Sequence, residues 1–338
     1  MKKYRPEGWL YQSAENQRLI STPEGLAEAL ACGTILEARA SVCDSSHNLI
    51  IDLPCGKAVI PREEGAIGIS DGTTRDIALI SRVNKIVSFK VTGLENTADG
   101  HYCAVLSRKA AQTECVQNYI SLLRAGDVID ARVTHLEQFG CFVDIGCGIP
   151  SLIPIDAISV SRISHPSDRF RIGETIRAAV KSTDGNRIFL THKELLGTWE
   201  ENAADFHQGE TVSGIVRSVE DYGVFVELAP NLAGLAEPKA GVSPGQSVSV
   251  YIKAIIPDKM KIKLIIVDVC EDIPSPKNNS YAFKGDHITS WSYSPETSEK
   301  RIMTIFDYCQ YLRKILCPEV FRGVWTFYGI CGIIDRRR

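Results

Sequence analysis

The chain has 338 residues, which is long enough for two or three small domains that each bury a core. A formal net charge of −3 excludes a uniformly basic surface, so contact with a polyanion would have to use local basic edges. The 11 cysteines include no C-x-x-C pair and no zinc-type spacing of His and Cys, which excludes the common zinc modules and is typical of a reducing cytoplasm.

Residues 1–32 are expected to form an irregular lead-in, over residues 1–20, followed by a helix. Thr22 supplies a capping hydroxyl and Pro23 stands in the first turn. Gly33 should end this helix, because glycine readily adopts the backbone conformation that stops one.

Residues 33–110 form the first, degenerate copy of a unit that recurs twice later in the chain. His47 and Ile50 stand where the later copies have aromatic residues. We therefore expect this copy to keep the fold without a stacking site, and to contact a partner or a neighbouring domain.

A helical spacer over residues 111–125 precedes the second copy, residues 126–194. Its central stretch contains Phe139, Gly140 and Phe142 among alternating polar and apolar residues, which predicts strands of a small antiparallel barrel. Strict alternation would place the two rings on opposite faces, but a glycine inside a strand often marks a bulge that resets the parity. We expect Gly140 to bring both rings to the outer face. From the strand alone, the alternative that Phe142, and Phe225 in the third copy, complete the barrel core stays open.

Basic residues gather in the later half of the second copy. They could form an ordinary solvated face, or an edge that contacts phosphates beside the two rings. Their interleaving with Phe139 and Phe142 favours the phosphate-contacting edge. The residues are Arg162, Arg169, Arg171, Arg177, Lys181, Arg187 and Lys193.

A second spacer, residues 195–208, precedes the third copy, residues 209–270. Tyr222, Gly223 and Phe225 repeat the order of ring, glycine and ring. Two neighbouring rings on a barrel surface suit the stacking of nucleic-acid bases. Lysines follow on the last strands, at Lys253, Lys259, Lys261 and Lys263. Carboxylates expected near the rings would repel phosphates and make this site weaker, namely Glu220, Asp221, Glu227 and Glu237.

Residues 271–338 are expected to form a linker and a poorly defined tail, because the repeat pattern fades and prolines and asparagines cluster. The apolar run at residues 323–334 is too short to span a bilayer, which takes about 20 residues. Neither a signal peptide nor a spanning segment is expected, so the interpretation includes no membrane.

The second and third copies share the motif Phe/Tyr-Gly-x-Phe-Val. It is followed by Gly-x-x-x-Leu-Ile-Pro and Arg-Ile-x-Leu-Thr in the second copy and by Gly-Leu-Ala-Glu in the third. This pattern resembles the RNA-binding domain of the ribosomal protein S1 family, over roughly residues 30–270 and most clearly in the second and third copies. The resemblance implies an all-β fold of three tandem, five-stranded OB-type barrels joined by short helical spacers. The whole arrangement is similar to the short ribosomal protein S1 homologues of Firmicutes.

In domains of this family, RNA is held by two aromatics, a histidine, an aspartate and an arginine. The resemblance places the aspartate on Asp184 and the arginine on Arg187, while Pro154 stands at the histidine position. In the third copy Lys261 replaces the arginine and Glu237 replaces the histidine. With neighbouring cations, the expected RNA-binding residues are Phe139, Phe142, Asp184, Arg187, Arg177, Lys181, Tyr222, Phe225, Lys253 and Lys261.

The leading interpretation is a cytoplasmic protein that binds single-stranded RNA and helps to present mRNA to the small ribosomal subunit. The alternative is a scaffold of similar barrels that binds protein and whose RNA binding is vestigial. An enzyme is not expected, because the sequence contains no phosphate loop, no metal-ligand cluster and no Ser, His and Asp arrangement. His165 and His192 are taken as surface residues, and no cofactor or catalytic residue is assigned.

Overall fold

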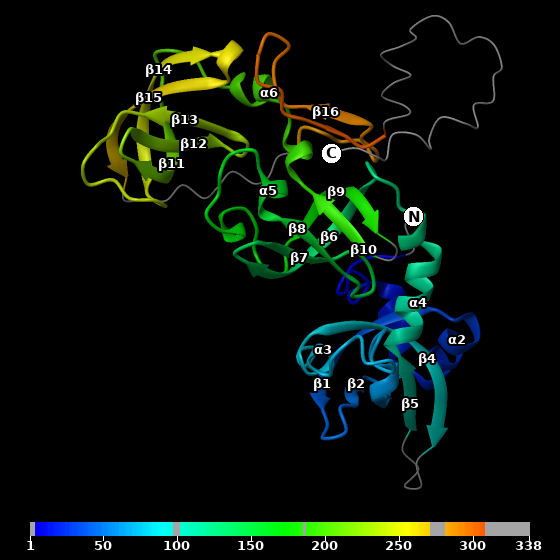
Figure 1. Cartoon of the computed structure of the whole chain (residues 1–338). Helices are drawn as coiled ribbons and strands as arrows, with labels where there is room; N and C mark the ends of the chain where they lie inside the picture. Colours follow the sequence, from blue (N-terminus) through cyan, green and yellow to red (C-terminus); the bar gives the residue numbers. More distant parts are fainter. Residues whose placement is uncertain (1–3, 97–101, 185–186, 271–280, 308–338) are drawn as a thin grey trace, which may run out of the picture.

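The computed structural model describes residues 4–96, 102–184, 187–270 and 281–307. Three closed five-stranded barrels follow one another along the chain, so the expected all-β class of tandem barrels is confirmed (Figure 1). In each barrel the first three strands form a meander, the fifth strand lies beside the third, and the fourth closes the barrel against the first. The apolar run at residues 323–334 lies outside the described residues.

The first barrel carries two helices at its amino-terminal side and a long connection between its third and fourth strands. α1 lies in the part of the chain expected to be irregular, and α2 begins after Thr22 and ends before Gly33, as predicted. The elements are α1 (Ala14–Ile20), α2 (Pro23–Cys32), β1 (Ile35–Cys43), β2 (Leu49–Leu53), β3 (Gly56–Ile60), η1 (Arg62–Glu64), α3 (Ile77–Ile80), β4 (Ile86–Asn96) and β5 (Tyr102–Ser107).

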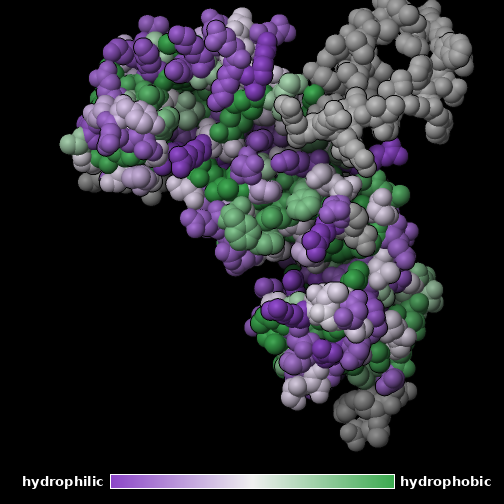
Figure 2. All heavy atoms as spheres, viewed as in Figure 1, coloured by the Kyte–Doolittle hydropathy of each residue, from purple (hydrophilic) through white to green (hydrophobic). Residues whose placement is uncertain are grey.

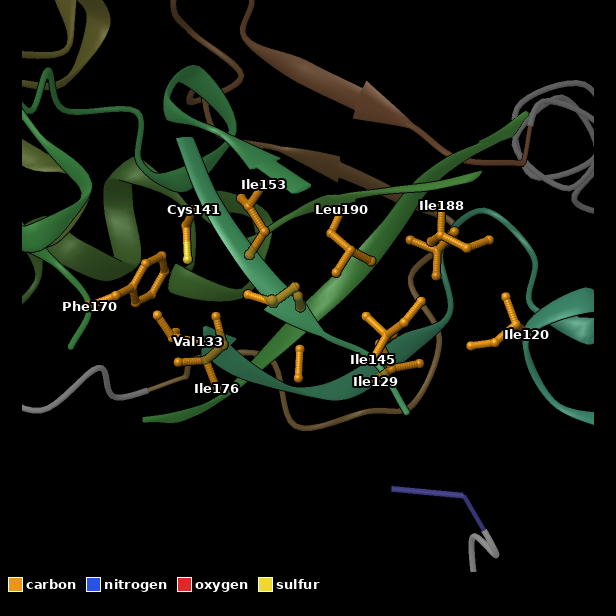
Figure 3. Close-up of a cluster of buried hydrophobic side chains, with 14 of the residues drawn as sticks. Ile120, Ile129, Val133, Cys141, Ile145, Ile153, Phe170, Ile176, Ile188 and Leu190 are labelled. Carbon is orange, nitrogen blue, oxygen red and sulfur yellow. The ribbon is translucent and has the colours of Figure 1, made fainter. Parts of the chain in front are cut away.

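The second barrel follows a spacer made of a helix and a short 3₁₀ turn, α4 (Arg108–Asn118) and η2 (Ile120–Leu122). Its elements are β6 (Val128–Glu137), β7 (Gly140–Asp144), β8 (Pro150–Pro154), α5 (Ile155–Ile158), η3 (Pro166–Asp168), β9 (Thr175–Asp184) and β10 (Arg187–Thr191). Cys141 and Val143 lie on either side of the outward Phe142 along β7 and are buried in its core. Figure 3 shows Cys141 and Ile153 in this core. Burial raises the pKa of the Cys141 thiol to about 12, so this cysteine is a neutral core residue.

The third barrel follows η4 (Lys193–Leu196) and α6 (Trp199–Ala203). Its elements are β11 (Thr211–Glu220), β12 (Gly223–Ala229), β13 (Leu232–Ala236), β14 (Ser247–Ile256), η5 (Pro257–Lys259) and β15 (Lys261–Cys270). No helix in the described part of the chain is long and apolar enough to cross a bilayer.

Residues 281–307 differ from the expected poorly defined tail. They carry a two-stranded sheet of β16 (Ser290–Ser292) and β17 (Met303–Ile305) that lies along the middle barrel and α6 (Figure 1). The backbone N–H of Val128 donates to Asp286 (2.9 Å), and that of Trp199 donates to Tyr293 (2.9 Å). Trp291 is buried in the same cluster as Trp199 and core residues of the third barrel, so this segment joins the second and third barrels.

The junction of the first two barrels is built around Glu7, in the lead-in segment. Its carboxylate accepts hydrogen bonds from the Arg108 side chain (2.8 Å) and the Ser88 backbone (3.1 Å). Its own backbone N–H donates to the buried carboxylate of Asp144 (2.6 Å), whose pKa is raised by burial. The lead-in segment therefore fastens the first barrel to the second.

The junction of the second and third barrels holds an ionic cluster and an asparagine clamp. Glu227, whose side chain is 5% exposed, forms ion pairs with Arg169 and Arg217. The Asn231 side chain accepts from the backbone of Val160 (2.8 Å) and donates to the carbonyl of Lys193 (2.8 Å). Because these contacts connect β12 and the loop after it to the second barrel, the two barrels have a fixed relative orientation.

Candidate nucleic-acid interface

The two rings of the second barrel lie on its outer surface. Phe139, in the turn between β6 and β7, is 56% exposed, and Phe142 is half-buried on the outer side of β7. Their ring centroids lie 5.8 Å apart with the planes nearly perpendicular. The alternative that Phe142 and Phe225 complete the core is therefore wrong, because each is half-buried between two buried neighbours that face the core.

The two rings lie together because Phe139 is in the turn before β7, where strand alternation does not apply, and not because of a bulge at Gly140. A bulge is present on β6, where it brings His135 to the outer face beside Phe142. The register of β6 against β7 shifts between Val133 and His135, which leaves Thr134 as the extra residue of a bulge. Gly140 has a different task, because a Cβ there would lie 2.6 Å from the carbonyl oxygen of Ile153 on β8. The glycine thus permits the close approach of β7 and β8.

A row of outward side chains crosses the second barrel perpendicular to its strands. The pairing registers connect His135 to Phe142, Phe142 to Leu152, Leu152 to Phe189, and Phe189 to Ser182. Figure 2 shows hydrophobic surface over the middle barrel, in the region of β7, β8 and β10. We give the name cross-strand row to the five residues His135, Phe142, Leu152, Phe189 and Ser182.

Phe189 is a ring that sequence reasoning missed. Ile188 and Leu190, on either side of it along β10, are buried in the core, so Phe189 faces outward. The signal lies in the sequence Arg-Ile-Phe-Leu-Thr, because successive side chains of a strand point to opposite faces and Ile188 and Leu190 suit the core.

Two of the expected cations lie beside the cross-strand row. Arg187 is exposed and stands two residues before Phe189 on β10, opposite the exposed Asp184 on β9. Lys181 is the extra residue of a bulge in β9 and is also exposed. Within the described residues, neither Lys181 nor Arg187 forms an ion pair, and both side chains are exposed.

Other basic residues of the second copy are engaged elsewhere. The Arg177 side chain donates to the backbone carbonyls of Phe283 (2.8 Å) and Gly285 (2.6 Å) in the carboxy-terminal segment. The side chain of Arg169 is 3% exposed and pairs with Glu227. Burial lowers the pKa of the Arg169 guanidinium, and the charge of Glu227 opposes this shift. The basic edge is thus smaller than the sequence suggested.

His192 is fully buried, which corrects the expectation of a surface residue. Its ring packs edge-on against Phe170 (4.8 Å) and Tyr281 (5.6 Å between centroids). Burial lowers its pKa to about 4, so the ring is neutral at physiological pH. His192 is a structural residue of the junction with the carboxy-terminal segment.

The third barrel repeats the surface with different chemistry. Tyr222 is 68% exposed and lies 6.2 Å from Phe225, with the rings again nearly perpendicular. The corresponding row consists of Ser218, Phe225, Leu235, Lys263 and Ala254. A lysine therefore occupies the position of Phe189.

The charges of the third barrel are partly balanced on the surface. Lys253 is the extra residue of the bulge in β14 and pairs with Glu237 (3.3 Å). Lys261 is exposed on β15, two residues before Lys263. Glu227, which was expected to repel phosphates beside the rings, is instead buried at the junction between barrels.

The first barrel has an aliphatic row in the same place, formed by Val42, Ile50, Val59, Val105 and Gly93. These five residues include no ring, as the degenerate sequence predicts, and no cation. In the described residues of the whole chain, no group of three or more His, Cys, Asp or Glu residues could hold a metal ion.

One family model and several known proteins match parts of this chain. Residues 122–193 match the family model of the S1 RNA binding domain. The chain is 32% identical over 223 residues to the small ribosomal subunit protein bS1 of Staphylococcus epidermidis, covering 60% of this chain and 54% of that protein. It is 33% identical over 195 residues to bS1 of Staphylococcus aureus (strain COL), covering 51% of this chain and 50% of that protein.

A solved multidomain protein with nucleic acid binding domains from Streptococcus pneumoniae is 13% identical, with a TM-score of 0.23, over 70% of this chain and 73% of that one. The chain spans about half the length of the curated relatives that it matches. The second barrel thus matches the S1 RNA binding domain, and the resemblance of the chain to the ribosomal protein S1 family is confirmed over about half of its length.

Proposed function

We propose that this protein binds single-stranded RNA on the outer faces of its second and third barrels. The observation that carries the proposal is the outward-facing pair of the exposed Phe139 and the half-buried Phe142, beside two cations without ion-pair partners among the described residues. Exposed rings on an OB-type barrel bind unpaired bases at about 1–3 kcal/mol per base. A base-paired duplex hides these base faces, so the site should select unpaired RNA.

Two linked sites should bind a long RNA more tightly than either barrel alone. The ionic cluster and the Asn231 clamp hold the second and third barrels together, so the second contact becomes intramolecular. A fixed orientation also lowers the entropic cost of engaging both barrels at once.

The test is the affinity for a fluorescent, unstructured 12-nucleotide RNA in the chain with Phe139→Ala and Phe142→Ala. Loss of two stacking rings should weaken binding at least about tenfold, the residual affinity coming from the third barrel. The matched control is Val42→Ala, which truncates an exposed residue of the equivalent row in the first barrel and should leave affinity unchanged. Unchanged affinity in the ring variant would refute the proposal and favour a protein-binding scaffold.

We further propose that the protein works at the small ribosomal subunit, for which the relatives are named, and that the bound RNA is mRNA in the cytoplasm. No catalytic step belongs to this function. Sedimentation of a cell lysate tests it. The protein should travel with the small subunit at low salt and be released by a high-salt wash, and its absence from that fraction at low salt would contradict the assignment.

A further inference from the structure

The ring of Phe189 is not explained by the needs of the barrel. Its position in the cross-strand row is occupied by Val105 in the first barrel and by Lys263 in the third. Both of those barrels close with the same strand order. An aliphatic and a cationic side chain therefore serve the fold equally well here, and the aromatic ring of the second barrel is free to have another role.

The row places Phe189 within reach of the same RNA strand as Phe142. Phe142 lies on β7 and Phe189 on β10, with Leu152 of β8 between them in register. Two strand spacings correspond to about 10 Å. This is a span that a few nucleotides of an extended single strand cover, since a chain of unstacked nucleotides advances by several ångströms per base.

The charges near Phe189 fit a strand that continues past it. Arg187 lies two residues away on β10, and Lys181 lies next to Ser182, the partner of Phe189 on β9. Cations at this side of the row would meet phosphates of the nucleotide that stacks on the ring. On the far side of the row, the His135 ring lies 6.4 Å from that of Phe142.

We propose that Phe189 is a third stacking ring, so that an unpaired RNA strand crosses the second barrel from His135 over Phe142 to Phe189. This inference rests on the proposed function. The second and third barrels then bind RNA differently, because Lys263 at the same position of the third barrel meets a phosphate instead of a base. The second barrel then binds more bases by stacking, and the third depends more on salt.

The test uses the full chain with Tyr222→Ala and Phe225→Ala, so that the second barrel dominates binding. In this background, Phe189→Leu, Phe189→Tyr and Phe142→Leu are compared, with RNA oligonucleotides of 3 to 12 nucleotides as ligands. Leucine keeps an apolar side chain like that of Val105, while tyrosine restores a ring. Thermal unfolding of each variant confirms that the outward substitution leaves the fold intact.

Phe189→Leu should weaken the longer oligonucleotides by roughly 5- to 150-fold, which corresponds to one stacked base. It should hardly change the shortest ones, whereas Phe142→Leu should weaken all lengths. Phe189→Tyr should bind like the parent chain. If Phe142→Leu weakens binding but Phe189→Leu does not, the third ring is refuted and the proposed function stands. If neither substitution matters, the proposed function itself is refuted.

Discussion

The buried ionic cluster between the second and third barrels allows a quantitative prediction for Glu227→Gln. Glutamine keeps the shape of the side chain but removes the charge that faces Arg169 and Arg217. The side chain of Arg169 is only 3% exposed, so water does not replace the lost partner. Removing one partner of a buried pair costs about 3–5 kcal/mol. The equilibrium between the docked and the disrupted junction should shift by roughly 150- to 5,000-fold.

The assay is urea denaturation followed by tryptophan fluorescence, because Trp199 and Trp291 are buried with the core of the third barrel. The matched control is Glu237→Gln, which removes the same charge from the same barrel in a pair with Lys253. That pair is 72% and 54% exposed, so its loss should cost less than about 1 kcal/mol. If Glu227→Gln and Glu237→Gln destabilise the chain equally, the cluster does not hold the barrels together.

Three further outcomes are expected. His192 has a pKa of about 4 in the folded chain, against 6.5 for an ordinary histidine. Its neutral ring therefore contributes fully to the free energy of unfolding above pH 6.5. This contribution is lost as the pH falls from 6.5 toward 4, and the total loss is about 3 kcal/mol. The free energy of unfolding is measured against pH for the parent chain and for His192→Gln, and the difference between the two curves isolates the contribution of His192. Parallel curves would contradict the prediction. Glu237→Gln should raise RNA affinity by about two- to fivefold, because Lys253 loses its surface partner and a negative charge is removed from the RNA-binding face. An unchanged or lower affinity in a binding titration would show that Lys253 does not contact RNA. Gly140→Ala should lower the free energy of unfolding by about 1–3 kcal/mol, because the new Cβ would press on the neighbouring strand β8. The control is Gly93→Ala, which should cost less because the nearest atom lies 3.6 Å from the new Cβ. Equal denaturation midpoints of the two variants would refute this prediction.

The tandem barrels and the paired rings were predictable from the sequence because they depend on local patterns. The spacing of Phe139 and Phe142 recurs at Tyr222 and Phe225, and in both barrels the rings lie together on the outer surface. The location of the bulge was not predictable, because the extra residue, Thr134, lies on the opposite strand and has no distinctive sequence signal.

Contacts between distant parts of the chain account for what the sequence did not reveal. The positive charge of Arg177 suits RNA binding, and the negative charge of Glu227 opposes it. Each side chain, however, is bound by a partner from another part of the chain. Charge type alone does not identify such a partner. Residues 281–307 were missed because their strands, β16 and β17, have three residues each and show no periodic pattern.

Photo-crosslinking of the unmodified full chain to a short RNA that carries 5-iodouridine most directly tests where unpaired RNA lies. Excited iodouracil bonds to aromatic rings that stack on it, and mass spectrometry of the peptides identifies the residue. The proposed site predicts crosslinks at Phe139 and Phe142, with weaker ones at Tyr222 or Phe225. Crosslinks confined to the first barrel or to the junctions between barrels would contradict it.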